Sequence, residues 1–103
     1  MSDDITASIV DDAKRIVRGE RRRTYGKPGE SFERIAALWS EYLRLLNKAR
    51  GHAVLMPEDV AAMMRLMKEA RLIQALDHRD SYVDLVGYAL CGAEIALKDA
   101  DQS

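Results

Sequence analysis

Two aspartates one helical turn apart stand in a segment that otherwise has the composition of a buried helix. Asp84 is the only charged residue between Tyr82 and Ala93, and Asp80 precedes it by four positions. Residues four apart lie on the same face of an α-helix, so both carboxylates can point the same way. A carboxylate in apolar surroundings must be ion-paired, hydrogen-bonded, metal-bound or protonated. The pair therefore predicts a metal or substrate site, with a structural ion pair as the alternative and a helix cap as a further role for Asp80.

The preceding predicted helix carries charges on its own apolar arc. Arg71 falls inside that arc, Lys68 at its edge and Asp59 on its other side. Long basic side chains can lie along apolar surface with their charged ends in water, which is one explanation. The other is a polar cluster between the two helices, in which Asp84 pairs with Arg71 or a ligand binds. Carboxylates and phosphate oxygens suit Mg²⁺. We therefore predict Asp59, Asp80 and Asp84 as magnesium ligands, and Lys68 and Arg71 as phosphate-binding groups.

Basic residues are concentrated in one segment, between Arg15 and Lys27. It precedes a helix predicted to begin at Pro28, whose free N–H groups could bind a phosphate. A basic loop with an aromatic residue could also contact nucleic acid. A solvated helix end, with cations at the negative pole of the dipole, is the simpler explanation. Sixteen basic residues face seventeen acidic ones, and this near-neutral balance disfavours general nucleic-acid binding.

Other residues capable of chemistry form no pattern typical of a site. Glu30 and Glu33 have the spacing of a carboxylate pair, but both project away from the apolar stripe that runs from Phe32 to Trp39. They are predicted to be ordinary surface residues. The two histidines lie far apart in the sequence and have no cysteine partners, so they predict no zinc site.

The elements that position these residues are all helical. Apolar periodicity predicts helices over residues 3–22, 28–49, 57–76 and 80–98. Pro28 and Pro57 suit first turns, and Gly51 is a stop signal. The short linkers favour antiparallel neighbours. We predict an all-α fold, a four-helix antiparallel bundle forming one domain over residues 1–103. Because 103 residues build only a small core, oligomerisation is expected to complete it, as a homo-oligomer.

The last predicted helix is apolar on all sides, so we expect it to be mostly buried. Gly87 and Gly92 within it favour close helix–helix or dimer contact over a ligand groove. Cys91, the single cysteine, is expected to be a buried thiol, which is typical of a reducing compartment. No apolar stretch reaches the ~18 residues of a membrane span, and the acidic beginning lacks the layout of a signal peptide. These features predict a cytoplasmic protein without a membrane partner.

Four groups of residues together form a signature. They are Tyr25-Gly26, Phe32-x-x-Ile35-Ala36-x-Leu38-Trp39-Ser40-x-Tyr42-Leu43, Asp59-Val60-Ala61-x-Met63-Met64 with Lys68-x-Ala70-Arg71-Leu72, and His78-Arg79-Asp80-Ser81-Tyr82-Val83-Asp84-x-x-Gly87-Tyr88-Ala89. This signature, over residues 23–94, resembles a family of small, functionally uncharacterised domains common in phages and prophages. The resemblance implies a phage protein that acts in the host cell cytoplasm.

A more distant resemblance is to the all-α nucleoside triphosphate pyrophosphohydrolases of the MazG-like class. Those enzymes hold Mg²⁺ with E-x-x-E and E-x-x-D pairs and cleave between the α- and β-phosphates. In this sequence Glu30-x-x-Glu33 matches the first pair in spacing alone, and the second pair is replaced by Asp80-x-x-x-Asp84. The resemblance implies a magnesium-dependent reaction on a nucleotide.

Three functions follow as hypotheses. The leading one is a magnesium-dependent nucleoside triphosphate pyrophosphohydrolase. The second is a non-catalytic phage protein that binds and sequesters a nucleotide through the same cations. The third is a protein–protein adaptor that uses the small residues of the last helix. Whether the chain is an enzyme stays open at this point.

Overall fold

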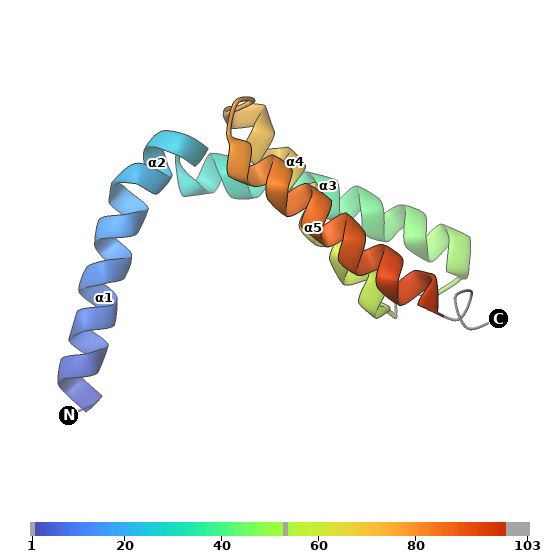
Figure 1. The fold of residues 1–103 in the computed structure, drawn as a ribbon, viewed down its shortest axis with the longest axis horizontal. Helices are drawn as coiled ribbons and strands as arrows, with labels where there is room; N and C mark the ends of the chain where they lie inside the picture. Colours follow the sequence, from blue (N-terminus) through green and yellow to red (C-terminus); the bar gives the residue numbers. More distant parts are fainter. Residues whose placement is uncertain (1, 53, 99–103) are drawn as a thin grey trace.

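The computed structural model describes residues 2–52 and 54–98, and these residues are almost entirely helical. The elements are α1 (Ser2–Arg18), α2 (Glu20–Tyr25), α3 (Pro28–Arg50), α4 (Pro57–Gln74) and α5 (Arg79–Ala96). Figure 1 shows α3, α4 and α5 side by side, with α1 extending away from them and α2 at the bend. The all-α prediction is confirmed.

Proline and glycine set most of the helix boundaries. Pro28 and Pro57 occupy the first turns of α3 and α4, where a backbone N–H would have no hydrogen-bond partner within the helix. Gly51 ends α3 in the left-handed conformation at a φ of 75°. Gly26, at a φ of 77°, turns the chain between α2 and α3. Gly19 separates α1 from α2, so the first predicted helix is two helices.

The packed part of the molecule has α4 at its centre, between α3 and α5. Among the residues that the structure describes, few apolar side chains are buried: Ile35 on α3 and Ala61, Ala70 and Leu72 on α4. Trp39 ties α3 to α4 by donating a 2.6 Å hydrogen bond to the carbonyl of Met63.

Helices α4 and α5 approach each other closely at Gly92. A Cβ added at Gly92 would lie 3.3 Å from the Cβ of Ala61, so the missing side chain permits the contact. A Cβ added at Gly87 would meet nothing within 4 Å. The predicted close helix contact is therefore confirmed for Gly92, whereas Gly87 faces open surface.

Helix α1 does not join the other helices in a bundle. Within the described part of the chain it packs against α2 alone. Its apolar side chains are exposed, Ile9 to 63%. The predicted four-helix arrangement is therefore not confirmed, because periodicity gave α1 an apolar face but did not determine what that face contacts.

Helix α5 is less buried than its composition predicted. Ser81 and Gly92 face α4 and are buried, while an opposite row of apolar side chains, including Val86 and Leu90, is exposed. Cys91 is exposed too, so the predicted buried thiol is wrong for this chain by itself. The expectation failed because, in the described part of the chain, α4 is the only helix packed against α5 and it covers one side. No helix within residues 2–52 and 54–98 is both long and apolar enough to cross a membrane.

Candidate functional site

Asp59, a predicted magnesium ligand, is fully engaged by the protein itself. Its carboxylate accepts hydrogen bonds from Arg50 at 2.5 and 3.0 Å, from the Tyr42 hydroxyl at 2.9 Å and from the Met56 backbone N–H at 2.8 Å. The residue is only 2% exposed. The hydrogen bonds from Arg50 outweigh burial and lower the pKa of Asp59 from 3.8 to about 2. Asp59 therefore fastens the end of α3 to the start of α4, and its oxygens are already occupied.

Asp84 is paired with Lys68 across the contact between α4 and α5. The Lys68 Nζ lies 2.8 Å from the Asp84 Oδ2, with 10% of the lysine side chain and 45% of the aspartate side chain exposed. The hydrogen bond and charge of Lys68 lower the pKa of Asp84, and the more distant charges of Arg71 and His78 add to this effect. The predicted polar cluster between the two helices is thus present. The partner of Asp84 is Lys68, however, and not Arg71 as predicted.

Arg71 has an aromatic partner in place of a carboxylate. Its Cζ lies 4.5 Å from the centroid of the Tyr25 ring, a distance typical of a cation–π contact. The ring edge of His78 meets the same tyrosine at 5.3 Å between centroids. No ion pair within residues 2–52 and 54–98 involves Arg71. The guanidinium is therefore oriented by stacking while its charge is not neutralised by a contacting carboxylate.

Arg71 and Tyr25 line a cavity of about 400 Å³ where the end of α1 meets α2, α3 and α4. We call it the arginine cavity; its lining residues are Val17, Arg21, Arg22, Tyr25, Gly26, Pro28, Ser31, Phe32, Met67 and Arg71. Three of these are arginines, and none of the described lining residues is acidic. Most of the wall is apolar. A concave, largely apolar site with a few convergent polar groups has the general character of a small-molecule site.

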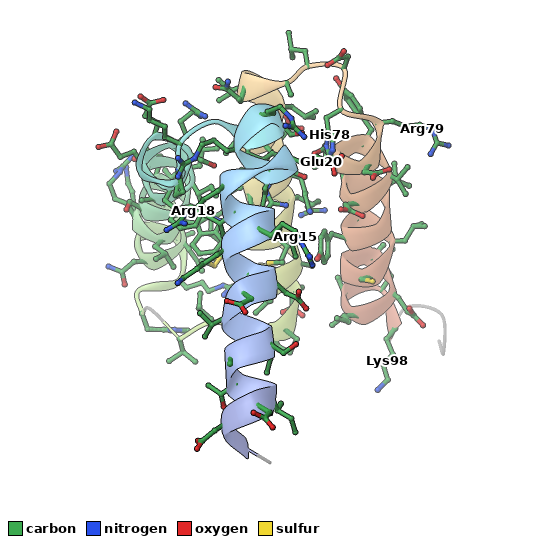
Figure 2. All side chains as sticks on the ribbon, turned by 90° about the vertical axis from the view of Figure 1, so that its left-hand side faces the viewer. Arg15, Arg18, Glu20, His78, Arg79 and Lys98 are labelled. Carbon is green, nitrogen blue, oxygen red and sulfur yellow. The ribbon has the colours of Figure 1, made fainter. Side chains whose placement is uncertain are left out.

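Asp80 lies at a different cavity, of about 580 Å³, between α1–α2 and the start of α5. Its charged lining is mixed, because Glu20 and Asp80 accompany several arginines. Figure 2 looks onto this side of the molecule and shows Arg15 on α1, Glu20 at the start of α2 and His78 just before α5. Asp80 is in the first turn of α5, two residues after the N-cap His78, so it is not the predicted cap.

The three predicted magnesium ligands are not brought together as a set. Asp59 is bound by Arg50, Asp84 by Lys68, and Asp80 lines the second cavity. Within the described residues, no group of three acidic, histidine or cysteine side chains is placed to hold a metal ion. The donor set therefore does not fit the predicted Mg²⁺ site. Glu30 and Glu33 are exposed, as predicted.

Sequence reasoning did not identify Tyr25, Arg21 and Arg22 as residues that share a cavity with Arg71. These three belong to the basic segment, which was interpreted mainly as a solvated helix end. The available signal was an aromatic residue among arginines beside Gly26. The sequence separation between Tyr25 and Arg71 concealed the stacking.

Comparisons with known proteins place the chain among phage proteins. It is 41% identical over 87 residues to the Gene 55 protein of Mycobacterium phage D29, an alignment that covers 84% of this chain and 52% of the relative. It is 43% identical over 82 residues to the Gene 55 protein of Mycobacterium phage L5, covering 80% of this chain and 48% of the relative. The chain thus spans about half the length of these curated relatives.

No solved structure matches the chain. Residues 8–96 match the family described as Domain of unknown function (DUF6378), a range that includes most of α1 and all of the arginine cavity. The predicted membership of a helical phage family is confirmed, and the distant resemblance to MazG-like enzymes gains no support from these matches. Since the match covers most of its length, this chain belongs to the DUF6378 family.

Proposed function

We propose that this protein binds the phosphate groups of a nucleotide, or of a related phosphorylated small molecule, in the arginine cavity. The observation that carries the proposal is Arg71, stacked 4.5 Å over Tyr25 and facing a cavity that also contains Arg21 and Arg22. Anions are attracted to such a site because the described lining has three positive charges and no acidic side chain.

The chemistry of arginine suits this ligand. A guanidinium presents a planar fork of donors that matches two phosphate oxygens at once, and stacking on an aromatic ring limits its motion before the ligand arrives. Pro28 and Ser31 bring the first turn of α3 to the same cavity, where the positive end of the helix dipole also favours an anion.

The apolar wall offers a place for the rest of the ligand. Phe32 is 64% exposed although it is a large aromatic residue, and it lines the cavity with Met67 and Tyr25. Aromatic faces stack on nucleobases with little regard to base identity. We therefore propose a ligand with a ring at one end and phosphates at the other.

Lys68, which was predicted to bind phosphate, is paired with Asp84. Asp84 holds its ammonium group, so Lys68 adds little unbalanced charge while that pair is intact. Lys68 is not among the residues that line the arginine cavity, and the positive charge of Arg71 helps to lower the pKa of Asp84.

We place binding ahead of magnesium-dependent pyrophosphohydrolysis, which stays a prediction. Catalysis of that kind needs carboxylates gathered around the metal. The proposed magnesium ligand Asp59 is occupied by Arg50, Tyr42 and Met56, and it lies outside the arginine cavity.

Calorimetric titration of the purified chain tests the proposal. The probes are inorganic pyrophosphate and a panel of nucleoside mono-, di- and triphosphates, each with and without Mg²⁺. We expect saturable binding that weakens by about tenfold or more in Arg71→Ala. Arg44→Ala is the matched control, because Arg44 is an exposed arginine paired with Glu41 on α3, outside the cavity lining.

The same samples separate binding from hydrolysis. After incubation with Mg²⁺, the protein is denatured and the released nucleotide is identified. Recovery of intact triphosphate supports a binding protein. Recovery of monophosphate and pyrophosphate in molar excess over the protein would instead support the pyrophosphohydrolase.

A further inference from the structure

Helix α1 has a broad apolar face that, within residues 2–52 and 54–98, packs against no helix other than α2, although Val17 at its end also lines the arginine cavity. At 100° per residue, Ile5, Ile9, Ile16 and Val17 fall within one arc, and Val10 extends that arc. All of these side chains are exposed. Within the described residues, the helix packs against α2 alone, and Figure 1 shows its full length extending away from α3, α4 and α5.

Such a helix needs a second surface to be stable. An isolated helix of this length is marginal in water, and amphipathic helices gain most of their stability by burying the apolar face. A continuous apolar stripe flanked by charges is typical of a helix that pairs with another helix.

The charges of α1 are divided between its two halves. Its acidic residues all precede its basic ones: Asp3, Asp4, Asp11 and Asp12 come first, and Lys14, Arg15 and Arg18 follow. Two parallel copies would place acid against acid and base against base. Two antiparallel copies would place each acidic half against a basic half and would also oppose the helix dipoles favourably.

We infer that α1 is a dimerisation arm, which pairs antiparallel with the α1 of a second copy of this chain. The contact would be symmetric about a two-fold axis, because each copy supplies the same apolar arc and the same two charged halves. Seventeen residues span about 26 Å, so the interface is at the small end of specific interfaces and we expect a weak, reversible dimer.

Sedimentation velocity of the full chain at increasing concentration measures the association. We expect a monomer–dimer equilibrium whose dissociation constant rises by about tenfold or more in Ile9→Asp, because the new carboxylate would enter the apolar contact. Ser8→Asp is the matched control: Ser8 is exposed outside the apolar arc, so its dimer should persist. A wild-type chain that stays monomeric overturns the inference, as does a dimer unaffected by Ile9→Asp.

Charge reversal tests the antiparallel pairing itself. One variant carries Asp3→Lys with Asp4→Lys, and the other carries Lys14→Glu with Arg18→Glu; both leave the Asp12–Arg15 pair within α1 intact. Each variant alone brings like charges together and is expected to be monomeric. An equimolar mixture restores both attractions, so a dimer of one of each should form.

The remaining outcomes are equally decisive. If the mixture stays monomeric while the wild type dimerises, or if either variant dimerises as well as the wild type does, α1–α1 pairing is overturned. The second of these results would assign the dimer to another surface, such as the exposed face of α5. Loss of the dimer at high salt supports the charge argument, because exposed charges are screened.

Discussion

Asp59 and Asp84 are each paired with a basic side chain, but their surroundings give the two pairs different consequences. Asp59 is buried and accepts hydrogen bonds from a guanidinium, a hydroxyl and a backbone N–H. The Asp84 side chain is 45% exposed and has one basic partner within bonding distance. Removing a buried carboxylate that accepts several hydrogen bonds leaves several donors unsatisfied, whereas removing the half-exposed Asp84 carboxylate leaves one donor, the buried Lys68 ammonium, without its partner. Asp59 is thus a structural residue with several partners, whereas Asp84 holds a single buried cation between α4 and α5.

Asp59→Asn should therefore destabilise the fold. The amide keeps the shape of the carboxylate but loses the charge that Arg50 and the Met56 N–H bind, so we expect the free energy of unfolding to fall by about 2 kcal/mol at neutral pH. Urea denaturation followed by circular dichroism measures the difference. Asp77→Asn is the control, since Asp77 is exposed in the turn before α5 and should change stability little.

The loss should also depend on pH. The pKa of Asp59 is about 2 in the folded protein, below its ordinary value of 3.8, so the unfolded chain binds this proton more readily. Its stabilisation is complete above pH 3.8 and disappears as the pH falls towards 2. The difference between wild type and Asp59→Asn should shrink over that interval. A difference that stays constant down to pH 2 would show that the carboxylate charge is not the cause.

Asp84→Asn should strengthen phosphate binding. The change frees the Lys68 ammonium and removes a negative charge from the neighbourhood of Arg71, so pyrophosphate affinity should rise by roughly twofold to fivefold at low salt. Calorimetric titration measures it, with Glu69→Gln on the exposed side of α4 as the control. Weaker binding in Asp84→Asn would instead favour a direct role for the carboxylate, such as the predicted metal ligand.

At the scale of the helices, local signals determined boundaries well but not neighbours. Pro28, Pro57 and Gly51 act through the backbone of their own turns, so their effects could be predicted from sequence. The structure divides the first predicted helix in two at Gly19, a residue that is unfavourable inside a helix. The exposed face of α5 and the exposure of Cys91 could not be predicted, because periodicity records which side chains are apolar and not which helix covers them.

The candidate site was predictable only in part, because the sequence shows unusual charges on a helix but not the residues that contact them. Lys68, Arg71 and Asp84 could be recognised as unusual because each is a charged residue at or near an apolar position of its helix. Their partners come from elsewhere: the Tyr25 ring lies on α2, and Arg50, the partner of Asp59, lies at the end of α3. Only the turn between α3 and α4 and the fold of α2 bring these groups into contact.

The α4–α5 contact makes the two glycines of α5 unequal. Gly92→Val should destabilise the protein by about 1 to 3 kcal/mol, because a side chain there meets the Ala61 Cβ. Gly87→Val is the matched control and should be neutral or slightly stabilising, since nothing lies within 4 Å and valine is the better helix former. Thermal unfolding of both variants compares them. Equal effects would contradict the close approach of the two helices.

At the scale of the whole molecule, one copy leaves much apolar surface uncovered. Exposed apolar rows run along α1 and along the outer side of α5, while few apolar side chains are buried. Apolar patches of this kind mark interaction surfaces more often than free surface. The small core predicted from chain length is therefore consistent with a protein that gains stability by association.

Self-association should make thermal stability depend on concentration. If the folded copies pair through α1 and unfolded chains do not, the Tm of the wild type rises with protein concentration. The Tm of Ile9→Asp should be independent of concentration, and that of Ser8→Asp should follow the wild type. Differential scanning calorimetry over a range of concentrations measures these values. A concentration-independent wild-type Tm would argue against the α1 dimer.

Titration of the protein with phosphate compounds tests directly whether the arginine cavity binds phosphate groups. Wild type, Arg71→Ala and Arg44→Ala are titrated in parallel with the same nucleoside triphosphate and with pyrophosphate. We predict saturable binding in the wild type and in Arg44→Ala, and a loss of about tenfold or more in affinity in Arg71→Ala. Absence of binding in the wild type, or equal affinity in all three proteins, would contradict it.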